Sequence, residues 1–185
     1  MKNFKQFGGN IIEDTNLYIL EYIKVHPEVT IIIGTDSNNS KGKTVFGTVI
    51  CFVHPGNGIH VIYTKEIMNK IDDIFLRMWT EVTISKTIAD EIEIYLHNYK
   101  KSFEQDRINN IPNAFKYLTD NNILLYKDDL HKICEIHCDI NPNKNYKSNI
   151  AYQATNGWLK SEGYIVKMKP NSYAASCAAD LICRH

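Results

Sequence analysis

Four acidic residues lie at positions from which they can meet at one site. Asp36 and Asp139 each end a segment with the composition of a strand. Glu81 lies on the apolar stripe of a predicted long helix, and Asp180 on the inner face of a predicted terminal helix. Clustered carboxylates raise one another's pKa unless divalent cations neutralise them, and ligation by oxygen alone suits Mg²⁺ or Mn²⁺. Two such ions, about 4 Å apart, can activate a water and stabilise the leaving oxygen of a phosphodiester.

Asp36 follows an uninterrupted run of β-branched residues, Thr30–Ile33 and then Gly34 and Thr35. Such a run predicts a strand covered on both faces, and ligands bind beyond strand ends in sheets of this kind. By itself Asp36 is better explained as a turn residue, because the polar residues that follow it suit a loop. The matching positions of the other three acids reverse this preference and favour a metal ligand.

Glu81 is predicted to project from the buried face of a helix. Residues 71–99 contain neither Gly nor Pro and carry apolar residues at helical spacing, and Glu81 falls within about 20° of Ile74, Ile88 and Ile92 on that stripe. An uncompensated buried carboxylate costs several kcal/mol, so Glu81 requires an ion, a cleft or a basic partner. Arg77, one turn earlier, is the partner that would make Glu81 purely structural.

The other patterns predict one α/β domain, residues 30–185, after a helical preamble at residues 1–29, with an insertion at about 100–131 that carries small helices of its own. Three strands joined by short turns predict an antiparallel meander, and a further strand, a helix, a short strand and a terminal helix capped by Ser172 follow the insertion. The predicted strands are residues 30–36, 44–53, 59–67, 134–140 and 164–168, and the predicted helices are residues 13–25, 71–99, 148–160 and 173–183.

Alternation along residues 134–140 separates two sets of side chains. His137 shares a face with Asp139, which leaves two roles open: a residue behind the site or, preferred here, a hydrogen-bonded core histidine. Cys134 and Cys138 point to the opposite face from His137, so these residues and His131 cannot close a tetrahedron around zinc. The five cysteines are expected to be reduced thiols.

On the terminal helix, an inward face is predicted to carry Tyr173, Ser176, Cys177 and Asp180.

The composition of the chain argues against a membrane protein and against a protein that holds nucleic acid through a broad excess of positive charge. With 21 basic and 21 acidic side chains, the chain has no broad excess of positive charge to hold nucleic acid, although a local basic groove remains compatible with this balance. No apolar run approaches the ~20 residues that span a bilayer, and the amino terminus lacks the apolar core of a signal peptide. We therefore expect a soluble, cytoplasmic protein without membrane contact.

Four short motifs, in order, resemble one known family. The predicted order of elements looks like the ribonuclease H fold with its Asp-Glu-Asp-Asp metal site, and more narrowly the motifs are similar to the YkuK family of predicted ribonuclease H-like nucleases. The resemblance runs from about Thr30 to Asp180. The motifs are Gly34-Thr35-Asp36-Ser37; Arg77 with Glu81-Val82 and Ser85; Ile136-His137 with Asp139-Ile140-Asn141 and Lys147-Ser148-Asn149; and Lys169-Pro170 with Ser172, Ala174-Ala175-Ser176 and Ala179-Asp180.

The resemblance implies an α/β, ribonuclease H-like mixed five-stranded sheet, three antiparallel strands then two parallel, with helices on both faces. The strands that carry Asp36 and Asp139 would be neighbours, and two Mg²⁺ or Mn²⁺ ions would be held by Asp36, Glu81, Asp139 and Asp180. The chain departs from the pattern before the last helix, where ribonuclease H enzymes often place a histidine. Lys169 is the charged residue of that loop here.

The leading hypothesis is a metal-dependent nuclease that hydrolyses RNA, DNA or a hybrid. Its substrate contacts would come from Ser37, Asn141, Lys147, Ser148, Asn149 and Lys169. The alternative is a non-catalytic ribonuclease H-fold module that binds nucleic acid or protein, which the neutral net charge favours. A third interpretation, an ordinary α/β domain, requires the four carboxylates to be scattered rather than gathered within about 8 Å of a common centre.

Overall fold

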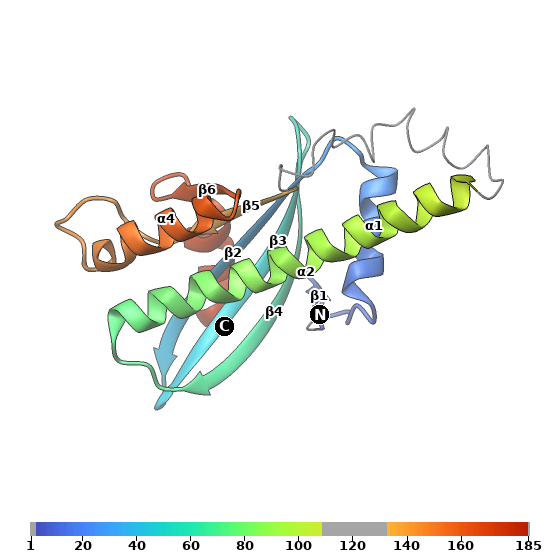
Figure 1. Cartoon of the computed structure of the whole chain (residues 1–185). Coiled ribbons are helices and arrows are strands. Elements are labelled where there is room, and N and C mark those ends of the chain that lie inside the picture. Colours follow the sequence, from blue (N-terminus) through green and yellow to red (C-terminus); the bar gives the residue numbers. More distant parts are fainter. Residues whose placement is uncertain (1–2, 109–132, 185) are drawn as a thin grey trace.

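The chain folds around one mixed sheet with helices on both faces, as a computed structural model of the protein shows (Figure 1). The structure describes residues 3–108 and 133–184; most of the predicted insertion lies outside them, and residues 100–108 belong to a helix. The strands are β1 (Lys5–Gln6), β2 (Thr30–Ser40), β3 (Lys43–His54), β4 (Gly58–Asn69), β5 (Cys134–Cys138) and β6 (Ile165–Met168). The helices are α1 (Thr15–Val25), α2 (Ile74–Ile108), the 3₁₀ turn η1 (Lys147–Ala151), α4 (Tyr152–Ser161), the π-helical η2 (Ala174–Ala179) and α5 (Asp180–Arg184).

The strand order is β1-β4-β3-β2-β5-β6. β2, β3 and β4 form the predicted antiparallel meander, and β5 and β6 join it in parallel, so the predicted mixed sheet is confirmed. The sixth strand, β1, was not predicted: its two residues pair antiparallel with β4 and are too few to carry a periodic pattern.

The first hairpin is longer and tighter than predicted. β2 continues through Ser40, which pairs with Lys43, so the predicted end of the strand at Asp36 is wrong. Only Lys41 and Gly42 form the turn, and both have positive φ, 48° and 74°. A two-residue turn with φ > 0 at both positions matches the twist of the flanking strands. The antiparallel pairing of β2 with β3 can therefore continue through the polar residues next to the turn.

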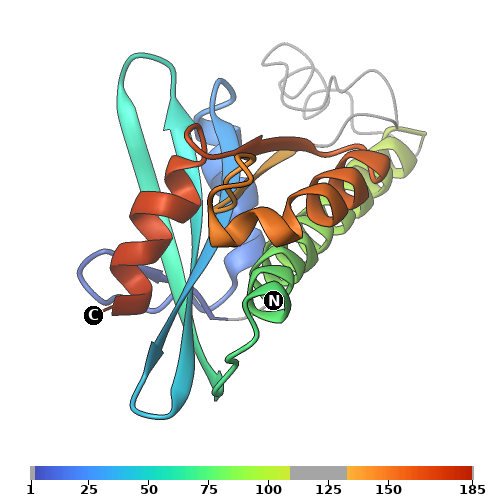
Figure 2. The same ribbon diagram turned by 90° about the vertical axis from the view of Figure 1, so that its left-hand side faces the viewer.

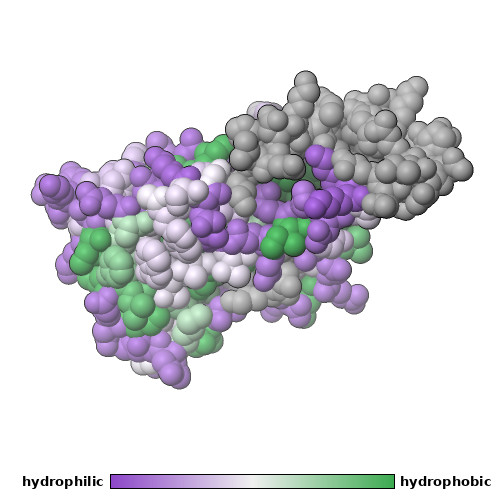
Figure 3. All heavy atoms as spheres, viewed as in Figure 1, coloured by the Kyte–Doolittle hydropathy of each residue, from purple (hydrophilic) through white to green (hydrophobic). Residues whose placement is uncertain are grey.

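α2 crosses one face of the sheet. It starts later than predicted because the Asp73 carboxylate accepts the Leu76 N–H, and it continues through Ile108. The predicted buried stripe is confirmed: Met78, Val82 and Ile92 belong to the main core with sheet residues. Apolar side chains also gather at the surface around the first turn of α2 (Figure 3), where Phe75 and Leu76 are exposed.

An aromatic stack joins α2 to α4. Phe75 stacks on Trp79 with ring centroids 6.0 Å apart, and Trp79 stacks on Trp158 of α4 at 5.0 Å. Lys86 lies over the Trp158 ring at 5.4 Å from its centroid. This stack holds α4 against α2, and Gly163, with φ 85°, ends the segment as predicted.

The carboxy-terminal segment, η2 and α5, covers the opposite face of the sheet (Figure 2). Glycines in the strands allow this close approach: a Cβ on Gly34 would lie 2.5 Å from the Ala175 nitrogen, and one on Gly47 would lie 2.6 Å from the Ala179 oxygen. The predicted inward face is wrong in part, because Tyr173 and Cys177 are exposed, whereas the buried residues are Ala174, Ala175, Ala179, Ile182 and Cys183. A π-helix bonds i to i+5, so residues rotate differently from the α-helical pattern used for the prediction.

Ser172 does not cap this helix as predicted. Its backbone oxygen accepts the N–H groups of Ala175 and Ser176, while its own hydroxyl is buried and makes no hydrogen bond. Asp14, in contrast, caps α1 through its carboxylate, which accepts the Leu17 N–H at 3.0 Å. No helix within residues 3–108 and 133–184 combines the length and the apolar character that crossing a membrane requires.

Residues before β2 share the core of the sheet. Phe4 and Ile19 are fully buried among sheet and α2 side chains, and Ile12 is nearly so. Tyr22 of α1 lies against Phe52 of β3, with ring centroids 4.4 Å apart. α1 therefore packs on the same core that supports α2.

Candidate active site

Asp36 and Asp139 are brought together by strand register. The parallel pairing of β2 with β5 ends at Thr35 and Cys138; Asp36 is the next residue of β2, and Asp139 directly follows the end of β5. Adjacent strands lie about 4.8 Å apart, so the two carboxylates are near neighbours. Thus β2 and β5 are adjacent, as the family resemblance implies, even though Asp36 lies within β2 and not at its end.

Glu81 lies beneath this pair on the buried face of α2. The residue is 2% exposed, and the Ser37 hydroxyl donates a hydrogen bond to its Oε1 at 2.5 Å. The Ser37 N–H donates to Asp36 Oδ1 at 2.8 Å. Ser37 therefore links the strand carboxylate to the helix carboxylate. The hydrogen-bond partner of Glu81 is Ser37 and not Arg77, although the charge of Arg77 acts on Glu81.

Asp180 reaches the same place from the other face of the sheet. One ligand atom from each of Asp36, Asp180 and Cys183 can be chosen so that all lie within 4.8 Å of one another. Asp180 also accepts a hydrogen bond from Arg184 Nε at 2.6 Å, one turn along α5. Two carboxylates and a thiol thus converge where the terminal helix crosses β2 and β3.

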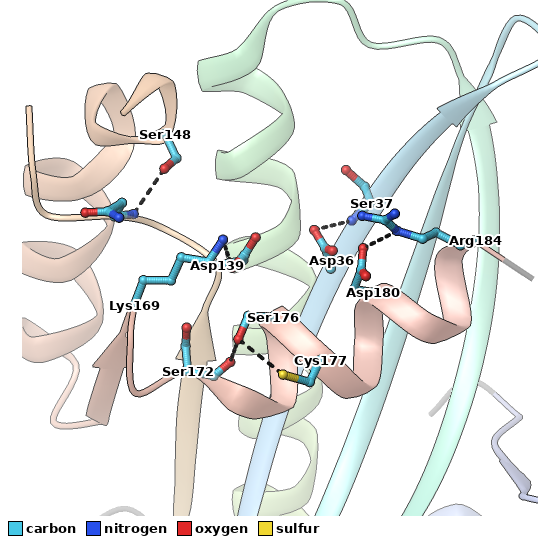
Figure 4. A network of polar contacts seen from close by, with 11 residues as sticks. Asp36, Ser37, Asp139, Ser148, Lys169, Ser172, Ser176, Cys177, Asp180 and Arg184 are labelled. Atoms are coloured by element: carbon cyan, nitrogen blue, oxygen red, sulfur yellow. Dashed lines mark hydrogen bonds and ion pairs between the residues drawn. The ribbon is translucent and has the colours of Figure 1, made fainter. Parts of the chain in front are cut away.

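Two basic side chains border the acids from opposite sides (Figure 4). Lys169 pairs with Asp139 through a 2.7 Å contact between Nζ and Oδ1, and Arg184 pairs with Asp180. Lys169 lies in the loop before η2, the place where the family resemblance leads to the expectation of a histidine. Both cations are partly exposed, so each ion pair is open to solvent.

The pKa values reflect crowded, buried negative charge. Burial, followed by the charges of Asp139 and Asp180, raises the pKa of Asp36 to about 7. Burial, followed by the charge of Asp36, raises the pKa of Glu81 well above its ordinary value. Removing water from carboxylates that repel one another disfavours their charged forms. The donor set, four carboxylates of which two are buried, fits a hard divalent cation that would replace these protons.

Cys183 was missed as a neighbour of the acids. It follows Asp180 by three residues, and this spacing, which places both residues on one face of a helix, is the sequence signal for their proximity. Its thiol donates to the Asp180 carbonyl oxygen at 3.3 Å, and burial raises its pKa to about 12. The thiol therefore stays neutral at physiological pH and suits a packing role more than ligation of Mg²⁺ or Mn²⁺.

A comparison with family models adds independent information. The ribonuclease H-like family model matches residues 14–184. The chain belongs to the ribonuclease H-like family. This confirms the predicted relationship and points to a nuclease-type or nucleic-acid-related function. No curated protein and no solved structure matches the chain.

The loop after β5, beside the acids, is held by its own polar side chains. The Asn141 N–H donates to Ser148 Oγ at 3.0 Å, and Asn149 Nδ2 donates to the Pro142 oxygen at 2.8 Å. Lys147 is exposed at the start of η1. Of the six predicted substrate contacts, Ser37 and Lys169 therefore touch the acids, whereas the structure assigns Asn141, Ser148 and Asn149 to the loop itself.

His137 of the ribonuclease H-like domain lies beneath η2. The Ala174 N–H points to its Nδ1 at 3.4 Å, and Tyr173 packs edge-on with ring centroids 4.7 Å apart. Burial, followed by the charge of Lys167, lowers the pKa of His137 to about 4. A neutral, buried imidazole with a backbone donor matches the preferred prediction of a core histidine.

Proposed function

We propose that the protein is a divalent-metal-dependent nuclease that hydrolyses phosphodiester bonds. The observation that carries this proposal is the convergence of Asp36 and Asp180 from two sides of the sheet, with oxygen atoms close enough to share a cation. The charge of Asp139 acts on both Asp36 and Glu81. A packing role alone gives no reason to gather acids whose charged forms destabilise one another.

Asp36, Glu81, Asp139 and Asp180 would hold two Mg²⁺ or Mn²⁺ ions. The bound ions would activate the attacking water and stabilise charge on the phosphate in an in-line displacement. Ser37 would keep Glu81 and Asp36 oriented through the two hydrogen bonds that it donates. Family membership supports this cofactor, because ribonuclease H-like nucleases generally use divalent metals.

Lys169 would hold the scissile phosphate. Lys169 pairs with Asp139, and its side chain is 39% exposed, so it can turn from a carboxylate to a phosphate at small cost. Lys147, exposed across the loop, would contact the nucleic acid further along its backbone, and Asn141, Ser148 and Asn149 would shape the loop between the two lysines.

Cleavage of labelled RNA, DNA and hybrid oligonucleotides in Mg²⁺ or Mn²⁺ tests the proposal. Asp36→Asn and Asp139→Asn each remove a ligand charge and should lower the rate about 1000-fold or more, which corresponds to several kcal/mol of transition-state stabilisation. Asp72→Asn is the matched control, because Asp72 is 74% exposed and pairs with the surface residue Lys70. Cleavage that persists in both variants would exclude the assignment.

The second candidate is a non-catalytic module that binds nucleic acid or protein. The observation in its favour is that Lys169 and Arg184 already neutralise two of the four acids. Titration with Mn²⁺ separates the candidates, because the nuclease requires cation sites that disappear in Asp36→Asn, whereas the module requires none.

A further inference from the structure

A second group of ligand-type side chains lies at the opposite end of the sheet from the acids. His26 ends α1, Glu28 lies before β2, and His54 ends β3; one ligand atom from each lies within 4.8 Å of the others. His54 follows Gly47, which pairs with Asp36, by seven residues along β3. At about 3.3 Å per residue this is roughly 23 Å, so the two groups are separate sites.

The ligand atoms face one another in a compact arrangement. Glu28 Oε1 lies 3.1 Å from His54 Nδ1 and 3.9 Å from His26 Nδ1. The rings of His26 and His54 meet edge to face with centroids 4.9 Å apart. Ligand atoms about 2.0–2.2 Å from a tetrahedral Zn²⁺ lie a little over 3 Å from one another, so a small inward movement of His26 would complete such a geometry.

Tyr22 orients both imidazoles. Its hydroxyl shares a 2.7 Å hydrogen bond with His54 Nε2, which leaves Nδ1 as the atom that faces Glu28. Its ring packs against His26 at 4.8 Å and stacks on His60 at 4.9 Å. A metal-bound histidine almost always uses its second nitrogen in a hydrogen bond that fixes the ring. His54, whose side chain is only 16% exposed, is already held in this way.

We propose that His26, Glu28 and His54 bind a divalent transition-metal ion of the zinc class. Two imidazoles and one carboxylate suit Zn²⁺ rather than Mg²⁺, so this site would differ from the carboxylate site in metal as well as in place. The ion would lie where His54 Nδ1 and Glu28 Oε1 now approach each other at 3.1 Å. It would also tie the connection after α1 to the β3–β4 hairpin, which lie beside each other at one end of the sheet (Figure 1).

Calorimetric titration of the full chain with Zn²⁺, under reducing conditions and in excess Mg²⁺, tests this site. Excess Mg²⁺ competes for the carboxylate site but not for imidazoles. A Cys177→Ser background removes the exposed thiol. Wild-type protein should show a Zn²⁺-binding event that weakens about 10-fold or more in His54→Ala and in Glu28→Gln.

Two matched controls for the Zn²⁺ titration remove an imidazole and a carboxylate that lie outside the proposed site. His97→Ala removes an exposed imidazole outside the group, and Glu21→Gln removes an exposed carboxylate, 58% exposed, on α1. Glu28 is 50% exposed, so Glu28→Gln is expected to fold even where His54→Ala does not. Zn²⁺ should raise the melting temperature of wild type and of the controls more than that of Glu28→Gln. Equal affinity in Glu28→Gln and Glu21→Gln, or absence of binding in wild type, would overturn the proposal.

Discussion

Asp36 should make the metal-free protein less stable as pH rises. Its pKa is raised to about 7 by burial and by Asp139, so the folded state keeps a proton that the unfolded chain loses near pH 4. Its contribution to stability is therefore complete below about pH 4 and is lost as pH rises toward 7. Asn carries no charge at any pH. Asp36→Asn should thus become more stable than wild type by an amount on the order of 4 kcal/mol at pH 8.

Urea unfolding in chelator at pH 5 and pH 8 measures this difference. His137 has the opposite sign, because its pKa of about 4 lies below that of the unfolded chain and its contribution grows as pH rises. It is present in both proteins, so it cancels when variant and wild type are compared. A stability difference that stays constant between pH 5 and pH 8 would show that Asp36 does not titrate as described.

Lys169 should compete with the metal ions and assist the substrate. Lys169→Gln leaves Asp139 without its cation, so Mn²⁺ affinity in the absence of substrate should rise a few-fold, as expected for a partly exposed ion pair. The same change should raise KM for an oligonucleotide. Lys167→Gln, an exposed lysine two residues earlier, controls for the loss of charge. Calorimetry measures the Mn²⁺ affinity, and steady-state kinetics measures KM. Loss of Mn²⁺ affinity in Lys169→Gln would contradict the prediction.

At the scale of elements, Gly47 sets the distance between the terminal helix and the sheet. A methyl group there would meet backbone atoms of Ala179 and Cys183 at 2.6 and 2.7 Å. Gly47→Ala should therefore destabilise the protein by about 1–3 kcal/mol and weaken Mn²⁺ binding, because α5 carries Asp180. Gly157→Ala on α4 meets open space and should stabilise by about 0.5–1 kcal/mol. Thermal unfolding of both variants checks the contrast, and equal effects would contradict it.

Periodicity was sufficient to predict most elements of this fold. The apolar stripe on α2 and the β-branched runs extend over many residues, so the type and order of these helices and strands can be predicted from the sequence. The errors lie where a few residues decide the geometry. β1 has two residues, the Lys41–Gly42 turn replaced a longer predicted loop, and the π-helical η2 rotated Cys177 outward. Each depends on pairing or packing against a distant segment, which spacing along the chain does not record.

At the scale of the whole molecule, the sequence could predict that the acids lie near one another but not which side chains contact them; their role as metal ligands stays a prediction. Glu81 was identified because a carboxylate on an apolar stripe needs compensation, and it is indeed buried. Its link to Ser37, forty-four residues earlier, depends on where α2 crosses the sheet. The same is true of Lys169 beside Asp139. The substrate roles of Ser37, Asn141, Lys147, Ser148, Asn149 and Lys169 stay predictions.

Metal binding should couple the site to the stability of the entire domain. Two of the acids come from the sheet, from β2 and from the end of β5. The other two come from α2 on one face and α5 on the other, so a cation bound among the four would hold these elements together. A ligand at about 100 times its dissociation constant stabilises the folded state by about 2.7 kcal/mol. Mn²⁺ should therefore raise the melting temperature of wild type at pH 8.

The same stabilisation should shrink at pH 5. Asp36 is protonated there, because its pKa is raised to about 7, and a cation must displace that proton. Asp36→Asn should lose most of the Mn²⁺ effect at both pH values, while Asp72→Asn should keep the wild-type response. NaCl at equal ionic strength controls for screening. A shift in melting temperature that is as large at pH 5 as at pH 8, or one that Asp36→Asn retains, would place the cation elsewhere in the molecule.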